Sequence, residues 1–260
     1  MMIRRILLVA VILGLSFNLS QAQNTYKADE VRLFQTFFQD TPIAAKPYGE
    51  GFFQYSNYDK LSSIDLAVQA AMPVADKIQV GGALGFRNLS PEVGDSQSGI
   101  TDLLVSGRYN IMPGPTAISV GAFATLPIGS EDIGESSFDF SGFGSIRHHL
   151  PSGLAITGTL GLEFIETVSG AKIDFTTGEV KKETKHESGL LIAGGVIYPT
   201  KSGLNIVGEL NIRTEGDYAF LTGALDYMLK SGGRVRGGIG IGLDNGAPDF
   251  ALRAGYYLGF

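Results

Sequence analysis

The sequence contains no cysteine and no tryptophan in its 260 residues. The absence of cysteine excludes disulfide frameworks, thiolate zinc sites and cysteine nucleophiles. Beyond the first 22 residues, no apolar run approaches the roughly eighteen residues that a membrane-spanning helix needs. Basic tails are also absent, which gives no support for a nucleic-acid partner. Glycine, in contrast, is abundant, with 36 residues.

The N-terminus has the three parts of a secretory signal. In "MMIRRILLVAVILGLSFNLSQAQ", Arg4 and Arg5 precede an apolar run over 6–17, and the small residues Ser20 and Ala22 follow. This pattern predicts a signal peptide over 1–22 that is cleaved after Ala22. A membrane anchor is the alternative, but the run is too short to cross a bilayer of about 30 Å. We therefore expect an exported chain, whose formal net charge changes from −6 to −8 when the two arginines are removed.

After residue 47, the sequence repeats one pattern, in which apolar residues alternate with polar or small ones. Alternation with a period of two is typical of β-strands that present different faces to different surroundings. In 154–164, for example, Leu154, Ile156, Leu160 and Phe164 share one face, while Thr157 lies on the other. The predicted strands are 48–59, 61–73, 78–88, 100–111, 116–127, 138–150, 154–166, 188–199, 204–214, 218–229, 234–243 and 250–260.

The connections between these strands differ in length. Five are tight and rich in turn-forming residues: 74–77, 112–115, 150–153, 200–203 and 230–233. The others tend to be longer, in particular 89–99, 128–137, 167–187 and 244–249. Short periplasmic turns and longer outer loops are typical of an outer-membrane β-barrel.

A soluble sandwich or a lipocalin would also alternate, and the position of the aromatic residues distinguishes these folds from a membrane barrel. Aromatic residues of the apolar face fall near the two ends of the strands, which predicts two girdles at the membrane interfaces. The girdle near the loop end comprises Phe86, Phe138, Phe140, Phe164 and Phe250, and the girdle near the turn end comprises Tyr109, Tyr198, Tyr227 and Phe260.

We therefore predict an all-β protein, a closed 12-stranded antiparallel transmembrane β-barrel over 48–260, in the outer membrane of a Gram-negative bacterium. Closure removes the unpaired strand edges that an open sheet would expose. The expected partners are outer-membrane lipid and lipopolysaccharide. The last strand alternates strictly and ends on Phe260, which resembles the signal that the barrel-assembly machinery recognises during biogenesis.

The other face of the strands carries charged residues of both signs. Two interpretations are open: the charges set the selectivity of a pore, or they form ion pairs that brace and close a narrow barrel. The predicted lumen-lining residues are Arg87, Arg108, Arg147, Arg213, Arg234, Arg236, Arg253, Glu50, Asp65, Asp102, Asp139, Glu163, Glu209 and Asp226.

Residues 23–47 precede the first strand and form a separate N-terminal segment. Val31, Phe34, Phe37 and Phe38 have helical spacing, so a short helix is predicted here. The segment is interpreted as a plug in the barrel or a periplasmic lid, and a tail lying against the membrane is the alternative. The loop 167–187 is predicted to be a hairpin that prolongs its two strands, with ligand binding as the less favoured interpretation.

No arrangement of residues indicates catalysis, a cofactor or a metal. The pair His148 and His149 lacks further ligands at suitable spacing for a metal site. No nucleophile and base can be placed together, so we expect that the protein is not an enzyme.

Two stretches resemble a known family. Residues 47–86 are similar to the opening of outer-membrane transporter-like proteins described as the MetA-pathway phenol-degradation family. Gly99 to Asp102 and Leu126 to Gly129 resemble its G-x-x-D and L-P-[TI]-G motifs, with Ile128 in place of the usual threonine. The resemblance implies a passive channel or transporter for small molecules, hydrophobic or aromatic ones among them. A closed structural or surface-interaction barrel is the alternative.

Overall fold

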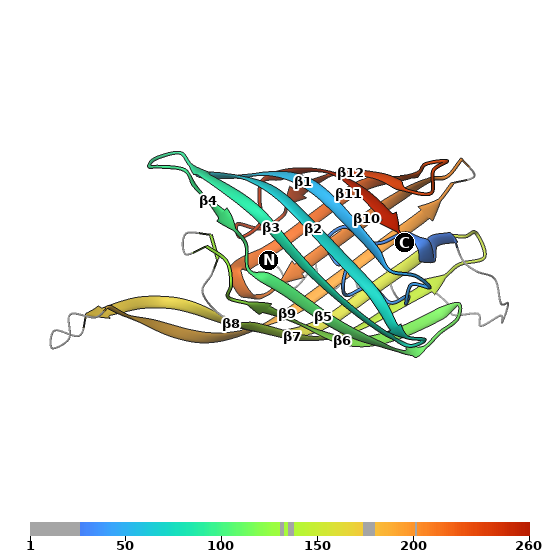
Figure 1. The fold of residues 1–260 in the computed structure, drawn as a ribbon, viewed down its shortest axis with the longest axis horizontal. Coiled ribbons are helices and arrows are strands. Elements are labelled where there is room, and N and C mark those ends of the chain that lie inside the picture. The colour runs from blue at the N-terminus through green and yellow to red at the C-terminus, as the bar shows by residue number, and fades with distance from the viewer. Residues whose placement is uncertain (1–26, 131–132, 135–137, 174–179, 201) are drawn as a thin grey trace.

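The computed structural model describes residues 27–130, 133–134, 138–173, 180–200 and 202–260. The predicted signal peptide, residues 1–22, lies outside the described residues. The remaining chain consists of antiparallel strands that follow the alternating pattern closely (Figure 1). The strands are β1 (Tyr48–Tyr58), β2 (Leu61–Ala75), β3 (Ile78–Pro91), β4 (Gln97–Ile100), β5 (Leu103–Met112), β6 (Thr116–Leu126), β7 (Asp139–His149), β8 (Ala155–Ile173), β9 (Val180–Pro199), β10 (Leu204–Arg213), β11 (Tyr218–Met228), β12 (Arg234–Gly242) and β13 (Phe250–Gly259).

The strands close into a barrel. β1 pairs with β13 on one side and with β2 on the other, and β3 pairs with both β2 and β5. β4 and β5 both lie along β3, as two parts of one strand interrupted at Thr101 and Asp102. The wall therefore has twelve strands, and the predicted closed antiparallel fold is confirmed.

The two ends of the barrel differ. Tight turns join β2–β3, β5–β6, β7–β8, β9–β10 and β11–β12 at the short-turn end. Gly114, Gly153, Gly203 and Gly232 have positive φ in four of these turns, a conformation that glycine adopts without a steric penalty. At the opposite, long-loop end, β8 and β9 pair out to Ile173 and Val180 and project beyond the wall (Figure 1). The predicted prolonged hairpin is thus confirmed.

The outer wall is apolar. Its exposed side chains include the nine predicted girdle residues, with exposed fractions between 41% for Phe250 and 67% for Phe260. The strand pairing places Phe140 opposite Phe164 near the long-loop end and Tyr227 opposite Leu204 near the short-turn end. The contact of these rings with membrane interfaces remains a prediction.

Residues 27–47, here called the inner segment, lie within the barrel. The segment begins with a single 3-10 turn, η1 (Lys27–Glu30), seen in blue in Figure 1, and continues as irregular chain to β1. Val31, Leu33 and Phe34 are at most 2% exposed. The short helix, predicted with Asp29 and Glu30 in its first turn, is present only as this 3-10 turn. Residues 31–38 are irregular, because wall side chains bind the main-chain groups that a helix would pair internally. No helix among the described residues is long and apolar enough to cross a membrane.

Candidate functional site: the occupied lumen

Wall arginines bind the inner segment through its main-chain carbonyl groups. Their guanidinium groups donate from four different strands, β5, β7, β12 and β13. The bonds run from Arg108 to Pro42 at 2.6 Å, from Arg147 to Ala28 at 2.7 Å, from Arg253 to Phe34 at 3.0 Å, and from Arg236 to Arg32. Because these bonds use the fixed fork of arginine, the wall determines the path of the segment from several sides.

One wall carboxylate, that of Glu209, binds main-chain N–H groups of the inner segment. Glu209, on β10, accepts hydrogen bonds from the main-chain N–H groups of Phe34 at 2.6 Å and Gln35 at 3.0 Å. It also accepts from the Thr36 N–H at 3.4 Å and the Thr36 hydroxyl at 3.1 Å. Successive N–H groups that converge on one anion form a typical anion-binding arrangement. Glu209 is itself buried, so the inner segment provides its hydrogen-bond donors in place of water.

Other lumen charges pair with one another along the wall. Arg236 lies 2.6 Å from Glu50 and 3.1 Å from Asp226. Arg234 contacts Asp226 at 2.7 Å, and Arg253 contacts Glu50 at 3.2 Å. These ion pairs join β1, β11, β12 and β13, which are consecutive around the wall. They stabilise one side of the barrel and hold the arginines that bind the inner segment.

Two further pairs lie nearer the long-loop end. Arg87 contacts Asp65 at 2.5 Å between β3 and β2, and Arg213 lies 3.7 Å from Glu163. The Arg87 and Arg213 side chains are 43% and 40% exposed. Within the described parts of the chain, neither pair forms a hydrogen bond with the inner segment.

The predicted lumen residues divide by burial. The buried ones are Glu50, Asp65, Arg108, Arg147, Glu163, Glu209, Asp226, Arg234 and Arg236. The partly buried ones are Arg87, Asp102, Asp139, Arg213 and Arg253. Asp102 lies at the break between β4 and β5, and its lumen-lining role remains a prediction. Its carboxylate accepts the Gly129 N–H at 2.7 Å and so fixes the loop after β6.

Asp139 also binds a main-chain group. Its carboxylate accepts a hydrogen bond from the Glu166 N–H at 2.9 Å. The two acids at the long-loop end therefore organise backbone at the rim. These contacts depend on how the chain folds at the strand ends. The alternation of apolar and polar residues along a strand does not predict them.

Aromatic groups also lie inside the lumen, where the sequence pattern predicted only charged and polar residues. Phe37 packs against Phe38 with ring centroids 5.1 Å apart, and against Tyr48 at 5.5 Å. Phe123 and Phe143 face inward from β6 and β7 and form a second buried cluster with Leu191. Phe143 lies four residues before Arg147 on β7, so both side chains are on the same face of the strand. This spacing could have predicted that Phe143 points into the lumen.

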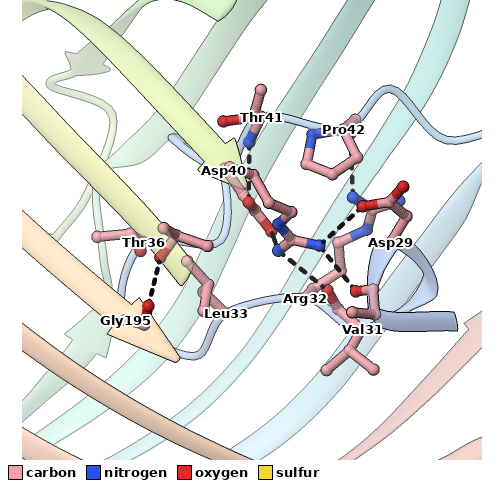
Figure 2. Close-up of polar contacts among 12 residues, drawn as sticks. Asp29, Val31, Arg32, Leu33, Thr36, Asp40, Thr41, Pro42 and Gly195 are labelled. Carbon is pink, nitrogen blue, oxygen red and sulfur yellow. Dashed lines mark hydrogen bonds and ion pairs between the residues drawn. The ribbon is translucent and has the colours of Figure 1, made fainter. Parts of the chain in front are cut away.

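Polar contacts also attach the inner segment to the wall at the short-turn end. Asp29 accepts a hydrogen bond from the His149 ring at 2.8 Å and lies 3.4 Å from Arg147. Burial alone would raise the pKa of Asp29, but the hydrogen bond with His149 and the charge of Arg147 outweigh it and lower the pKa below its usual value. Arg32 turns back to donate to the Pro42 carbonyl at 3.0 Å (Figure 2).

The other histidine of the pair, His148, forms a hydrogen bond with Thr116 at 2.7 Å. No group of three or more metal-binding side chains occurs in the described ranges.

Comparison with known proteins gives a family match and several structural likenesses. The model of the family described as "Putative MetA-pathway of phenol degradation" matches residues 48–260, which comprise every wall strand. No curated protein sequence matches the chain.

Among solved structures, the COG4313 outer membrane channel from Pseudomonas putida F1 has a TM-score of 0.66 at 14% identity, covering 88% of this chain and 100% of that one. The KdgM porin in complex with disordered oligogalacturonate has a TM-score of 0.54 at 12% identity, covering 81% and 99%. The translocator domain of the autotransporter NalP from Neisseria meningitidis has a TM-score of 0.52 at 13% identity, covering 84% and 89%. These likenesses show the fold of outer-membrane barrels.

Proposed function

The chain belongs to the family described as putative MetA-pathway of phenol degradation, and on this premise we propose that it is a passive outer-membrane channel for small molecules whose inner segment acts as a plug. The proposed location requires export through the cleaved signal over 1–22. The barrel wall then contacts outer-membrane lipid and lipopolysaccharide, after insertion by the barrel-assembly machinery.

One observation supports this proposal above all: the inner segment, which is separate from the wall strands, lies in the lumen and is bound there by wall side chains. The wall binds that segment with hydrogen bonds to its main chain at Ala28, Phe34 and Pro42, among others. A barrel built only as a closed scaffold would bring its charges together across the lumen. Here the ion pairs of the wall run between nearby strands, as between Arg236 and Asp226, and the inner segment lies among them.

The family and the fold support the class of function, and the resemblance supports hydrophobic or aromatic compounds as solutes. The similar solved structures include an outer membrane channel and a porin, which supports the proposal that the protein is not an enzyme.

Single-channel recording in planar bilayers tests the proposal. The mature protein and a variant lacking residues 23–46 are refolded, and their folding is checked by heat-modifiable migration on a gel. We expect rare or small openings from the mature protein and stable stepwise conductance from the truncated variant. Silence from both folded forms would overturn the channel and leave the closed structural barrel as the explanation.

A further inference from the structure

Residues 38–42, in the final part of the inner segment, contact two wall arginines, Arg108 and Arg147. Arg108 donates from Nη1 to the carbonyls of Phe38, at 3.4 Å, and Asp40, and from Nη2 to the Pro42 carbonyl at 2.6 Å. Arg147 places Nη2 at 2.5 Å from the Asp40 carboxylate, and both side chains are fully buried. Two guanidinium groups thus hold Asp40: Arg147 binds its carboxylate and Arg108 binds its main-chain carbonyl.

Between the two arginines, the wall presents a row of neutral polar groups. Asn110, Ser119 and Ser145 are aligned across β5, β6 and β7 by the strand pairing. Ser119 donates to the Thr41 carbonyl at 2.8 Å, and the Thr41 hydroxyl donates to Ser145 at 3.2 Å. Asn110 also donates to the Thr41 carbonyl at 3.4 Å, so the row binds the residue that directly follows Asp40 and contributes hydroxyl and amide groups there.

This part of the wall has no carboxylate of its own. β5 and β6 contain no acidic residue, and the sole acid of β7 is Asp139, at the long-loop end of that strand. Among the described residues, the ion pairs of Arg147 are with Asp29 and Asp40, both in the inner segment. Arg236 and Arg253, by comparison, have Glu50 in the wall. Buried charges without a counter-ion are costly, so this site requires an anion from outside the wall.

An apolar surface adjoins the charged groups. The ring of Phe38 lies directly on Gly81, where an added Cβ would come within 2.7 Å of it. Phe38 belongs to a buried cluster that includes Ala83 and Leu104, and Leu104 also packs against the lumen cluster of Phe123 and Phe143. The wall around Arg108 and Arg147 therefore accepts a flat apolar group and a carboxylate at the same time.

We propose that Arg108 and Arg147, with Ser119, Ser145 and Asn110, form the binding site for a small monocarboxylate with an aromatic or short aliphatic body, and that Phe38 and Asp40 of the inner segment occupy it as a tethered mimic of that ligand. A free ligand of this class competes with residues 38–42 and so favours release of the plug. The proposal deepens the proposed function and rests on it, because the ligand is the solute of the channel.

The test uses benzoate as the probe and neutral benzamide as its matched control. Binding to the mature, refolded protein in detergent micelles is measured by isothermal titration calorimetry. Asp40→Asn removes the competing carboxylate, so the site is free in a larger fraction of the molecules. We therefore expect this variant to bind benzoate at least about tenfold more tightly than the wild type. Glu30→Gln removes a charge of the same sign from η1, where Glu30 pairs with Arg234 at 2.9 Å, and should leave the benzoate affinity unchanged.

Two further variants strengthen the test. Adding Arg147→Gln to Asp40→Asn should abolish the gain for benzoate. Phe38→Ala frees the apolar part of the site and keeps the ion pair, so it should also tighten benzoate binding and supplies the test if Asp40→Asn fails to fold. Affinity for benzoate that no variant raises, or an equal gain for benzamide, would overturn the proposal.

The binding experiment and the conductance experiment can fail independently, so the site and the channel are tested separately. Charge-dependent benzoate binding in a protein that is silent in bilayers would retain the site and overturn the channel. Conductance of the truncated form without charge-dependent benzoate binding would retain the channel and overturn the site.

Discussion

The carboxylate of Glu209 lies 2.6 Å from the main-chain nitrogen of Phe34, and this hydrogen bond joins β10 to the centre of the inner segment. The same carboxylate accepts the N–H groups of Gln35 and Thr36. Hydrogen bonds to a charged acceptor are stronger than those between neutral groups. Among the described residues, Glu209 is thus the one acidic wall residue that accepts hydrogen bonds from main-chain N–H groups of the inner segment.

Replacing Glu209 with glutamine should loosen the plug. The substituted side chain would keep one acceptor oxygen but lose the negative charge, at a cost of about 2 kcal/mol for charge-assisted bonds, or roughly 30-fold in the ratio of open to closed channels. Single-channel recording measures this ratio. Glu163→Gln is the matched control, because Glu163 is equally buried but pairs with Arg213. Equal open fractions in the two variants would show that the charge on Glu209 does not hold the segment.

Arg108 and Arg213 should affect the channel differently. Arg108→Ala removes donors to the carbonyls of the inner segment and is expected to raise the open fraction about tenfold. Arg213→Ala should leave the open fraction unchanged, because Arg213 pairs with Glu163 of the wall and not with the inner segment. Reversal potentials under a salt gradient should shift toward cation preference in both variants when residues 23–46 are deleted. A higher open fraction in Arg213→Ala would contradict this division.

Acid should release the short-turn end of the plug through Asp29. The pKa of Asp29 is lowered in the folded protein, so its contribution is complete above the ordinary pKa of an aspartate and is lost as pH falls through the lowered value. The open fraction should therefore rise as the pH falls below about 4. Comparing recordings of the wild type with those of Asp29→Asn isolates this effect, since the variant lacks the titrating group. An identical rise in both proteins would assign the acid response to other groups.

Gly129 should resist substitution because of the loop that Asp102 holds. A Cβ at Gly129 would lie 2.7 Å from the Asp102 carboxylate and 2.8 Å from the Ile100 carbonyl. Gly129→Ala is expected to destabilise the barrel by about 1–3 kcal/mol, typical of overpacking, and to lower the temperature of the heat-modifiable transition. Gly142→Ala is the control, because a Cβ there has no heavy atom within 4 Å. Equal transition temperatures would show that the loop can rearrange without cost.

The wall could be predicted from the sequence because its physical cause is local. A strand between lipid and a polar lumen must alternate, so the predicted first strand 48–59 matches β1 at Tyr48–Tyr58 within a residue. The same holds for the last strand, predicted at 250–260 and observed at Phe250–Gly259. Turn residues with positive φ, such as Gly153, marked the ends of strands in the same local way.

The inner segment could not be predicted in the same way. Its apolar spacing from Val31 to Phe38 indicated a helix, but the irregular chain is determined by distant partners such as Glu209 and Arg236. Those contacts span more than 170 residues of sequence, as between Phe34 and Glu209. Similarly, parity placed Arg108 on the inner face but could not show that its partners are main-chain carbonyls.

The wall binds the inner segment mainly at main-chain carbonyl and N–H groups, which nearly every amino acid provides. Replacing a side chain between Arg32 and Thr36 removes few of these bonds, whereas inserting or deleting one residue between Ala28 and Pro42 moves the carbonyl groups away from Arg108, Arg147 and Arg236. The length of this stretch is therefore under much stricter constraint than its composition.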